Sequence, residues 1–179
     1  MADLPHIGLR EFQATIAGSP LATFFDYWLG LRQALGRLPR RTEIDPAEIK
    51  QILEFIVLLD HDAERQDYLV RLAGTSVRES LKFELTGKYI SDVFSADTLG
   101  QTLARYDLVR TLSLPHYIDA AREQSDGRTY EFRRLLVPLD GNSLMNCGLV
   151  RTHVDHLDTS LVDMTSEMKV ICDYLVDLD

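Results

Sequence analysis

Residues 116–154 of this 179-residue chain read HYIDAAREQSDGRTYEFRRLLVPLDGNSLMNCGLVRTHV. Two clusters of turn residues divide this stretch, Asp126-Gly127 and the run from Asp140 to Ser143. Aspartate, asparagine and glycine favour the tight turns that join antiparallel strands. The stretch therefore predicts three consecutive strands, at about 116–124, 129–138 and 144–154, that pair as hairpins.

Two further strands are predicted upstream of this stretch. Residues 55–59 form a short apolar run, which is typical of a buried strand. Residues 68–73 place Tyr68, Val70 and Leu72 on one face, which is the spacing of a second strand. The polar turn between the two runs indicates that they form another hairpin.

Helices are predicted between the two groups of strands. The pattern favours a short helix at 77–81 and a longer one that begins after Ser95 or Asp97 and ends before Pro115. The order is then two strands, helices and three strands, which is typical of an α+β protein. We therefore expect a five-stranded antiparallel sheet with helices on one face, plus helices at both ends of the chain.

The N-terminal segment contains a well-defined helix signal. Ser19 can cap the helix, Pro20 suits its first turn, and Gly36 can end it in a left-handed conformation. The apolar residues of this segment share one helical stripe: Leu21, Phe24, Phe25, Trp28 and Leu35. We expect Trp28 to be largely buried, against the sheet or against a second copy of the chain.

The C-terminal segment has apolar residues at alternating spacings of three and four. They are Leu161, Met164, Met168, Ile171, Leu175 and Leu178. This heptad pattern predicts an amphipathic helix, which could pack on its own sheet or pair with a second copy or a partner helix. The predicted organisation is a helical extension at 1–52, a core at 53–155 and a C-terminal helix at 156–179.

The two terminal helices lead to a prediction about assembly. Together they carry more apolar surface than one small sheet can cover, and such surface must be buried somewhere. We therefore expect a homodimer, with the interface candidates Phe24, Trp28, Leu161, Met164, Met168, Ile171 and Leu175. Such a contact could also exchange one copy for a different protein partner.

Composition excludes several classes of protein. Hydrophobic residues make up 45% of the chain and charged residues 26%, as in a globular protein with its own core. No apolar run approaches the length of a membrane-spanning helix, and no secretory leader is recognisable, so we expect a cytoplasmic protein. The net charge of −9 argues against binding to nucleic-acid phosphates.

Several sequence blocks, in order, carry a resemblance to a known family. They are Tyr27-Trp28-Leu-Gly-Leu-Arg32, Leu38-Pro39-x-Arg41-x-x-Ile44-Asp45-Pro46-x-x-Ile49, Leu58-Leu59-Asp60, Tyr68-x-x-Arg71-Leu-Ala-Gly74-Thr75, and Glu84-Leu85-Thr86-Gly87 preceded by Glu79. Over roughly residues 21–154 the chain resembles a bacterial subfamily of small, mostly stand-alone PAS-like proteins with few assigned functions. The order of strands and helices agrees with a PAS domain.

The resemblance implies a sensory or regulatory module that acts by binding and signals through its terminal helices. A pocket for a small apolar or amphipathic ligand would lie between the sheet and the helices of residues 74–112. The candidate lining residues are Tyr68, Val70, Phe83, Phe94, Tyr106, Phe132 and Cys147. Two alternatives stay open: these residues fill a solid core in a pure interaction scaffold, or the chain is a small enzyme with a cupped sheet.

The sequence offers little support for catalysis or for a cofactor. It contains no nucleophile elbow, no Walker loop and no dinucleotide fingerprint. Haem ligation would need a histidine that faces the pocket, and only His116 lies on a suitable strand. The flavin-adduct motif of some PAS proteins is absent, since Asn146-Cys147 falls on a strand. We therefore predict a non-enzyme without a metal site; the sequence requires no cofactor and names none, and it argues against haem and flavin.

Overall fold

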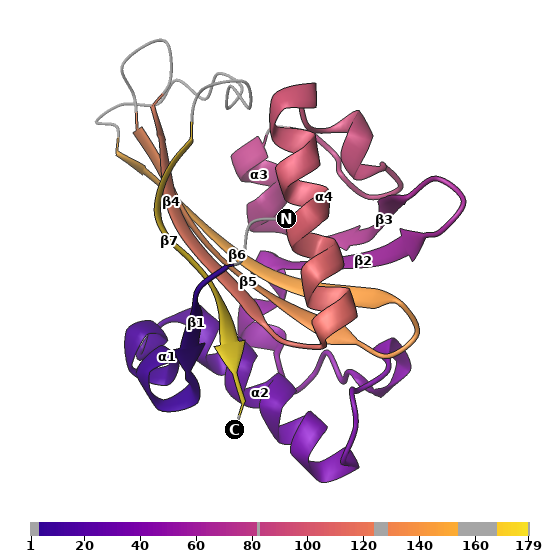
Figure 1. Cartoon of the computed structure of the whole chain (residues 1–179), viewed down its shortest axis with the longest axis vertical. Helices are drawn as coiled ribbons and strands as arrows, with labels where there is room; N and C mark the ends of the chain where they lie inside the picture. The colour runs from indigo at the N-terminus through magenta and orange to yellow at the C-terminus, as the bar shows by residue number, and fades with distance from the viewer. Residues whose placement is uncertain (1–3, 82, 124–128, 154–167, 179) are drawn as a thin grey trace.

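The computed structural model describes residues 4–81, 83–123, 129–153 and 168–178 (Figure 1). They form a seven-stranded sheet with the strand order β1-β7-β4-β5-β6-β2-β3. The strands are β1 (His6–Gly8), β2 (Ile56–Asp62), β3 (Asp67–Ala73), β4 (His116–Glu123), β5 (Thr129–Leu139), β6 (Ser143–His153) and β7 (Met168–Asp177). The helices are α1 (Leu9–Ile16), α2 (Pro20–Leu35), α3 (Thr75–Leu81) and α4 (Ala96–Leu112), with the 3-10 helices η1 (Arg41–Glu43), η2 (Lys50–Phe55) and η3 (Ile90–Asp92).

The five predicted strands, β2 to β6, occupy adjacent places in this sheet and pair antiparallel. The α+β class is therefore confirmed, but the predicted number of five strands is wrong. Two strands from the ends of the chain extend the sheet beyond β4. β7 pairs antiparallel with β4, and β1 pairs parallel with β7.

The turn between β5 and β6 forms as its residues predict. Leu139 pairs with Ser143, and the two residues at the tip, Gly141 and Asn142, have φ angles of 82° and 63°. The loop between these paired residues has three residues, Asp140 to Asn142, and glycine and asparagine accept positive φ most readily. The other predicted turn, Asp126-Gly127, lies outside the described residues.

The helices of the predicted core, α3 and α4, lie on one face of the sheet as expected, and the N-terminal helices α1 and α2 cover the other face (Figure 1). The reason for cover on both faces is visible in β5, where Leu135, Leu136 and Val137 are all fully buried. Successive strand residues point to opposite faces, so a strand that is apolar at every position needs cover on both sides.

The face under α1 and α2 is a closed apolar core, which we call the closed face. Trp28 is fully buried there, and its indole Nε1 donates a 2.9 Å hydrogen bond to the carbonyl oxygen of Pro138 on β5. The predicted burial of Trp28 against the sheet is thus confirmed. Gly36 ends α2 with a φ of 65°, as predicted. Phe24 is also fully buried, so neither Phe24 nor Trp28 lies on the surface of the chain as an interface residue would.

The predicted C-terminal helix is wrong for Met168–Asp177, because this segment is strand β7. Leu175 is only 2% exposed and packs within its own chain, while Val170 and Ile171 are 41% and 61% exposed. Heptad spacing coincides here with β-branched and aromatic residues, and tertiary pairing with β4 decides in favour of the strand. Of the remaining residues in the heptad pattern, Leu161 and Met164 lie outside the described residues, and so does the side chain of Met168.

Candidate ligand-binding pocket

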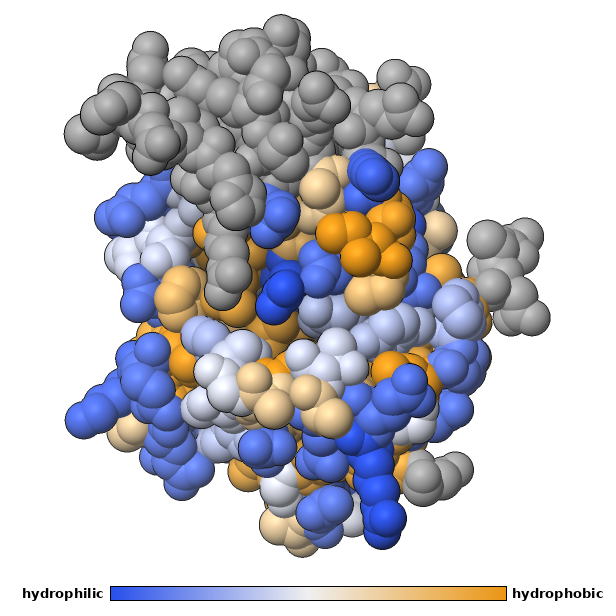
Figure 2. Space-filling model, turned by 90° about the vertical axis from the view of Figure 1, so that its left-hand side faces the viewer, coloured by the Kyte–Doolittle hydropathy of each residue, from blue (hydrophilic) through white to orange (hydrophobic). Residues whose placement is uncertain are grey.

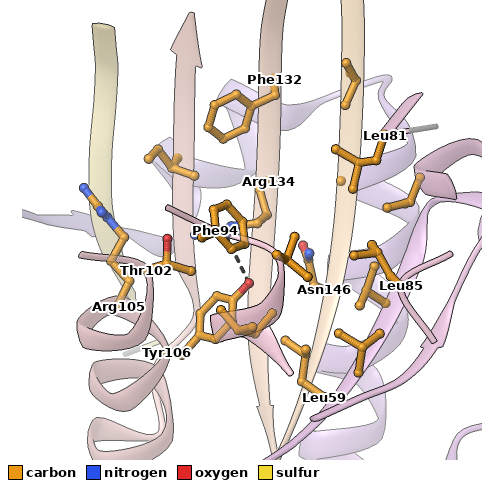
Figure 3. A pocket seen from close by; sticks show the side chains of 18 of the residues that line it. Leu59, Leu81, Leu85, Phe94, Thr102, Arg105, Tyr106, Phe132, Arg134 and Asn146 are labelled. Carbon is orange, nitrogen blue, oxygen red and sulfur yellow. Dashed lines mark hydrogen bonds between the residues drawn. The ribbon is translucent and has the colours of Figure 1, made fainter. Parts of the chain in front are cut away.

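A pocket of about 190 Å³ lies between α4 and the sheet, on the face opposite the closed face. We call this second side the pocket face. In Figure 3, strands β5 and β6 form the floor, α4 stands on one side, and Leu59, Leu81 and Leu85 line the other. Most lining side chains are apolar: Val57, Leu59, Val70, Val77, Leu81, Leu85, Ile90, Val93, Phe94, Ile118, Phe132 and Val150.

The structure brings four of the seven predicted pocket residues together. Val70, Phe94, Tyr106 and Phe132 line the pocket, although they come from β3, the segment before α4, α4 itself and β5. They meet because the hairpin of β2 and β3 and the helix α4 cover the same face of β5 and β6. The predicted location, between the sheet and the helices that follow β3, is where the structure has its pocket.

Tyr68 and Phe83 belong to the core around the pocket rather than to its lining. Tyr68 is buried, and its phenol donates a 2.8 Å hydrogen bond to Asp107 on α4. Burial and this bond raise the pKa of Tyr68 above its ordinary value, so the phenol stays neutral. The Tyr68–Asp107 bond therefore fixes α4 against β3 beside the pocket.

Cys147 does not line the pocket and packs on the closed face instead. On β6 the pocket-face positions are Asn146, Gly148 and Val150, and Cys147 lies between two of them. Side chains alternate along a strand, so a residue next to Asn146 must point the other way. Burial raises the pKa of the Cys147 thiol to about 12, and the thiol is therefore protonated and acts as a small apolar side chain.

Among the polar residues that line this mainly apolar pocket, Arg134 from β5 and Asn146 from β6 project from its floor (Figure 3). The Nη1 of Arg134 donates a 3.3 Å hydrogen bond to the phenol oxygen of Tyr106. The Nε of Arg134 and the Oδ1 of Asn146 are buried, and neither has a partner in the described part of the chain. Buried polar groups are nearly always hydrogen-bonded, so an unpaired donor and acceptor in a pocket are unusual.

The floor of the pocket is open at Gly148. This glycine pairs with Arg134 across β5 and β6, and a Cβ built on it would meet no atom within 4 Å. Its backbone does not need glycine, because its φ is not positive. The absent side chain at Gly148 therefore leaves open space on the pocket floor, at the position that pairs with Arg134.

Arg105 links the rim of the pocket to the C-terminal strand. From α4, its Nε and Nη2 both donate to Oδ2 of Asp173 on β7, at 2.9 and 2.5 Å. The other carboxylate oxygen of Asp173 lies 2.5 Å from Nε2 of His116 on β4. All three side chains are largely buried, so this cluster ties α4, β4 and β7 together.

The protonation of this cluster follows from burial and pairing. Burial alone would raise the pKa of Asp173, but the bonds from His116 and Arg105 outweigh it and hold the pKa at about 2. Burial lowers the pKa of His116, against the raising effect of Asp173. A neutral His116 then donates its Nε2 hydrogen to the ionised carboxylate, which leaves its buried Nδ1 without a partner in the described structure.

The sequence reasoning missed Arg134, Asn146, Gly148 and Arg105. A signal for two of them was present, since Arg134 precedes the apolar run from Leu135 to Leu139, and Asn146 sits between Met145 and Cys147. A polar residue inside an apolar strand is an informative exception. Arg105 gave no comparable signal, because its partner Asp173 lies in a segment predicted to be helical.

Neither a haem site nor a metal site is assembled by the described residues. His116 is turned toward Asp173 and does not line the pocket. No group of three histidine, cysteine or acidic side chains with metal-binding geometry occurs in the described ranges. Within those same ranges, no helix combines the length and the apolar character that a membrane crossing needs.

An antiparallel core of five strands, with helices that enclose a small, mainly apolar pocket on one face, defines the α+β class of this domain. A family model for the PAS domain matches residues 16–148, which is more than half of the chain. The chain belongs to the PAS domain family, and the resemblance seen in its sequence is confirmed at that level. A search of curated proteins and a search of solved structures each found no match.

Proposed function

We propose that this protein is a sensory or regulatory PAS module that works by binding a small, mainly apolar molecule in the pocket beside α4. The observation that supports this most strongly is the pocket itself, which is walled by apolar side chains and contains unpartnered polar atoms. Its volume of about 190 Å³ exceeds the ~150 Å³ of an engineered apolar cavity that binds benzene. The pocket face is thus not a solid core, in contrast with the scaffold alternative.

The lining favours binding over acid–base catalysis. The described residues around the pocket include no aspartate, glutamate, histidine or cysteine. A general acid or base needs one of a few titratable side chains within reach of the substrate. The tyrosine there, Tyr106, accepts a hydrogen bond from Arg134. PAS domains generally serve as non-catalytic signalling modules, in agreement with this lining.

The route from pocket to output is proposed to run through Arg105 and Asp173. Arg105 lines the pocket, and its partner Asp173 lies on β7, the strand that pairs with both β4 and β1. A ligand that displaces α4 would pull on this ion pair and so on the strands from both ends of the chain. In this proposal the signal still leaves through the terminal segments, as the sequence suggested. The segments that carry it are the strands β1 and β7 rather than a C-terminal helix.

Assembly and location remain predictions. Burial of Phe24, Trp28 and Leu175 removes these residues as support for the homodimer, and among the candidates with described side chains Ile171 is exposed. Figure 2 views the molecule from the left-hand side of Figure 1, and on this face the apolar side chains lie in separate patches between polar ones. Light scattering at tens of micromolar tests for a dimer, and the variant Ile171→Lys tests whether Ile171 lies in the dimer interface.

The cytoplasmic location and the absence of nucleic-acid binding remain predictions from the sequence.

The binding function can be tested with neutral probes. Two-dimensional NMR of the full chain would be recorded with increasing indole and cyclohexanol, after native mass spectrometry for any co-purified molecule. We expect shifts around Leu59, Phe94 and Phe132 in the wild type and clearly smaller ones in Gly148→Val, whose side chain takes up space on the pocket floor. Gly30→Val is the matched control, because Gly30 lies on α2 and a Cβ there also meets nothing within 4 Å. Absence of pocket shifts and of a co-purified molecule in the wild type would refute the proposal.

A further inference from the structure

We propose that the ligand of this pocket carries a carboxylate, held by Arg134 beside Asn146, on an apolar body little larger than a benzene ring. This inference rests on the proposed binding function and adds the chemical class of the ligand. It follows from three features of the described part of the pocket: an arginine without an acidic partner, an amide oxygen without a hydrogen-bond partner, and an open position on the floor at Gly148.

Arg134 is the arginine without a counter-ion. Arg105, which lines the pocket, is paired with Asp173, and Arg133, whose side chain points to the opposite face of β5, is paired with Asp119. Across the described ranges no acidic side chain forms an ion pair with Arg134. The guanidinium carbon lies 5.2 Å from the centre of the Tyr106 ring, a cation–π contact that does not supply a negative charge. A half-buried cation that lacks an anion is costly, and an anionic ligand would offset that cost.

The free edge of Arg134 has the shape for a carboxylate. Nη1 is used by Tyr106, whereas Nε is buried and has no partner among the described groups. Nε and Nη2 form the side of the guanidinium whose two N–H bonds run parallel. Two parallel N–H donors match the two oxygens of a carboxylate, which makes such pairs bidentate and strong.

Asn146 completes the head-group site. It pairs with Leu136, two residues from Arg134 on the same face of β5, and only 8% of the residue is exposed. Its Oδ1 is buried and unpartnered within the described structure. A half-turn of the terminal amide exchanges oxygen and nitrogen, so the same position can present an N–H to a carboxylate oxygen. Arg134 and Asn146 thereby offer donors from neighbouring strands to one anionic group.

The remaining surface sets the size and character of the body. Gly148 leaves open space at the position paired with Arg134, and the walls include Phe94, Phe132 and the leucines labelled in Figure 3. A volume of about 190 Å³ fits a benzene-sized ring with a short acidic arm, or an aliphatic acid of similar bulk. An inorganic anion would satisfy Arg134 but leave these apolar walls in contact with water.

The test compares a carboxylate with its neutral isostere. Phenylacetate, hexanoate, phenylacetamide and inorganic phosphate would each be titrated into the full chain, with dissociation constants from NMR shifts at constant ionic strength. We expect at least one of the two carboxylates to bind, and phenylacetamide to bind at least about tenfold more weakly than phenylacetate, since it loses a charge-assisted bidentate contact. Phosphate should not bind in the pocket.

Two adjacent arginines provide the matched variants. Arg134→Met keeps an unbranched side chain but removes the charge, and it should abolish the preference for the carboxylate while phenylacetamide still binds. Arg133→Met removes the neighbouring charge, which is paired with Asp119 on the opposite face, and should leave the preference intact. Gly148→Val should clearly weaken binding of every probe. Thermal melts of each variant establish that it is folded.

Several outcomes would overturn the carboxylate assignment. They are equal affinity for phenylacetate and phenylacetamide, unchanged phenylacetate affinity in Arg134→Met, tight binding of phosphate alone, or no binding of either carboxylate. If neutral probes still enter the pocket in these cases, the binding function stands and only the ligand class fails. If neither the carboxylates nor the neutral probes bind in the pocket, the proposed binding function itself is refuted.

Discussion

The two faces of this sheet are built from the same strands, yet they differ in what they contain. On the closed face, Trp28 satisfies its one polar atom with a backbone carbonyl, and its neighbours are apolar. On the pocket face, Arg134 and Asn146 each have a buried polar atom with no partner among the described residues, beside an open volume. A chain under selection for stability alone would fill both faces alike. The difference indicates that stability is concentrated on one face and binding on the other.

The largest expected effect is on the closed face. Trp28→Ala removes a fully buried indole and its hydrogen bond to Pro138, and should lower the free energy of unfolding by about 4 kcal/mol. Urea denaturation followed by circular dichroism measures the change. Trp28→Phe is the control and should lose clearly less, since it keeps most of the ring volume. A loss below about 1 kcal/mol for the alanine variant would contradict the assignment of this face as the main source of stability.

The second effect concerns the ion pair that borders the pocket. Asp173→Asn leaves Arg105 with a buried charge and no anion, and should cost about 3 kcal/mol of unfolding free energy. Asp177→Asn is the matched control on the same strand, because Asp177 pairs with His6 at an exposed position and should contribute less than about 1 kcal/mol. Equal losses in the two variants would mean that the buried cluster does not hold β7 in place.

Adjacent residues of β6 give the sharpest comparison of the two faces. Cys147→Leu adds volume to the filled closed face and should destabilise by about 2 kcal/mol. Gly148→Val adds volume to the pocket and should leave stability unchanged within about 0.5 kcal/mol or raise it slightly. The same urea experiment measures both. If the two variants were equally destabilised, the pocket face would be as tightly filled as the closed face.

The smallest expected effect is a pH dependence. Burial lowers the pKa of His116, so the unfolded chain takes up a proton on this residue at a higher pH than the folded chain does. Unfolding free energy should therefore fall as the pH drops from 7.5 through about 6.5, the ordinary value for histidine. The neighbours of His116 are Arg105, Arg134 and Asp173, and the last stays ionised because its pKa is about 2.

The variant His116→Gln isolates this contribution. Its unfolding free energy should change less between pH 7.5 and pH 5.5 than that of the wild type, and His61→Gln serves as the control histidine. Denaturant melts at four pH values within this window suffice. An identical pH slope in the wild type and in His116→Gln would show that His116 does not contribute.

The sequence predicted the central strands because turn residues mark their ends, as at Gly141 and Asn142. It could not assign faces, because Leu144, Met145 and Cys147 are all apolar and alternation carries no information where both faces are buried. Cys147 was placed in the pocket for this reason. The segment at 168–177 was read by its heptad spacing, although Val170, Ile171, Tyr174 and Val176 favour a strand. The pocket itself depends on a glycine and two polar side chains from different strands, which no single window of sequence brings together.

The pairing of β1 with β7 bears on the order in which the structure can open. β1 has three residues, and its hydrogen bonds are made to a strand at the far end of the chain. Contacts between distant segments carry the largest loop-closure entropy, and small edge units open below the global unfolding free energy. β1 and β7 should therefore exchange their amide hydrogens sooner than β2, β5 and β6. Because Asp173 belongs to β7, each such opening also releases Arg105 at the rim of the pocket. Ligand binding in the pocket should therefore slow amide hydrogen exchange in β1 and β7, because both depend on the same local unfolding equilibrium.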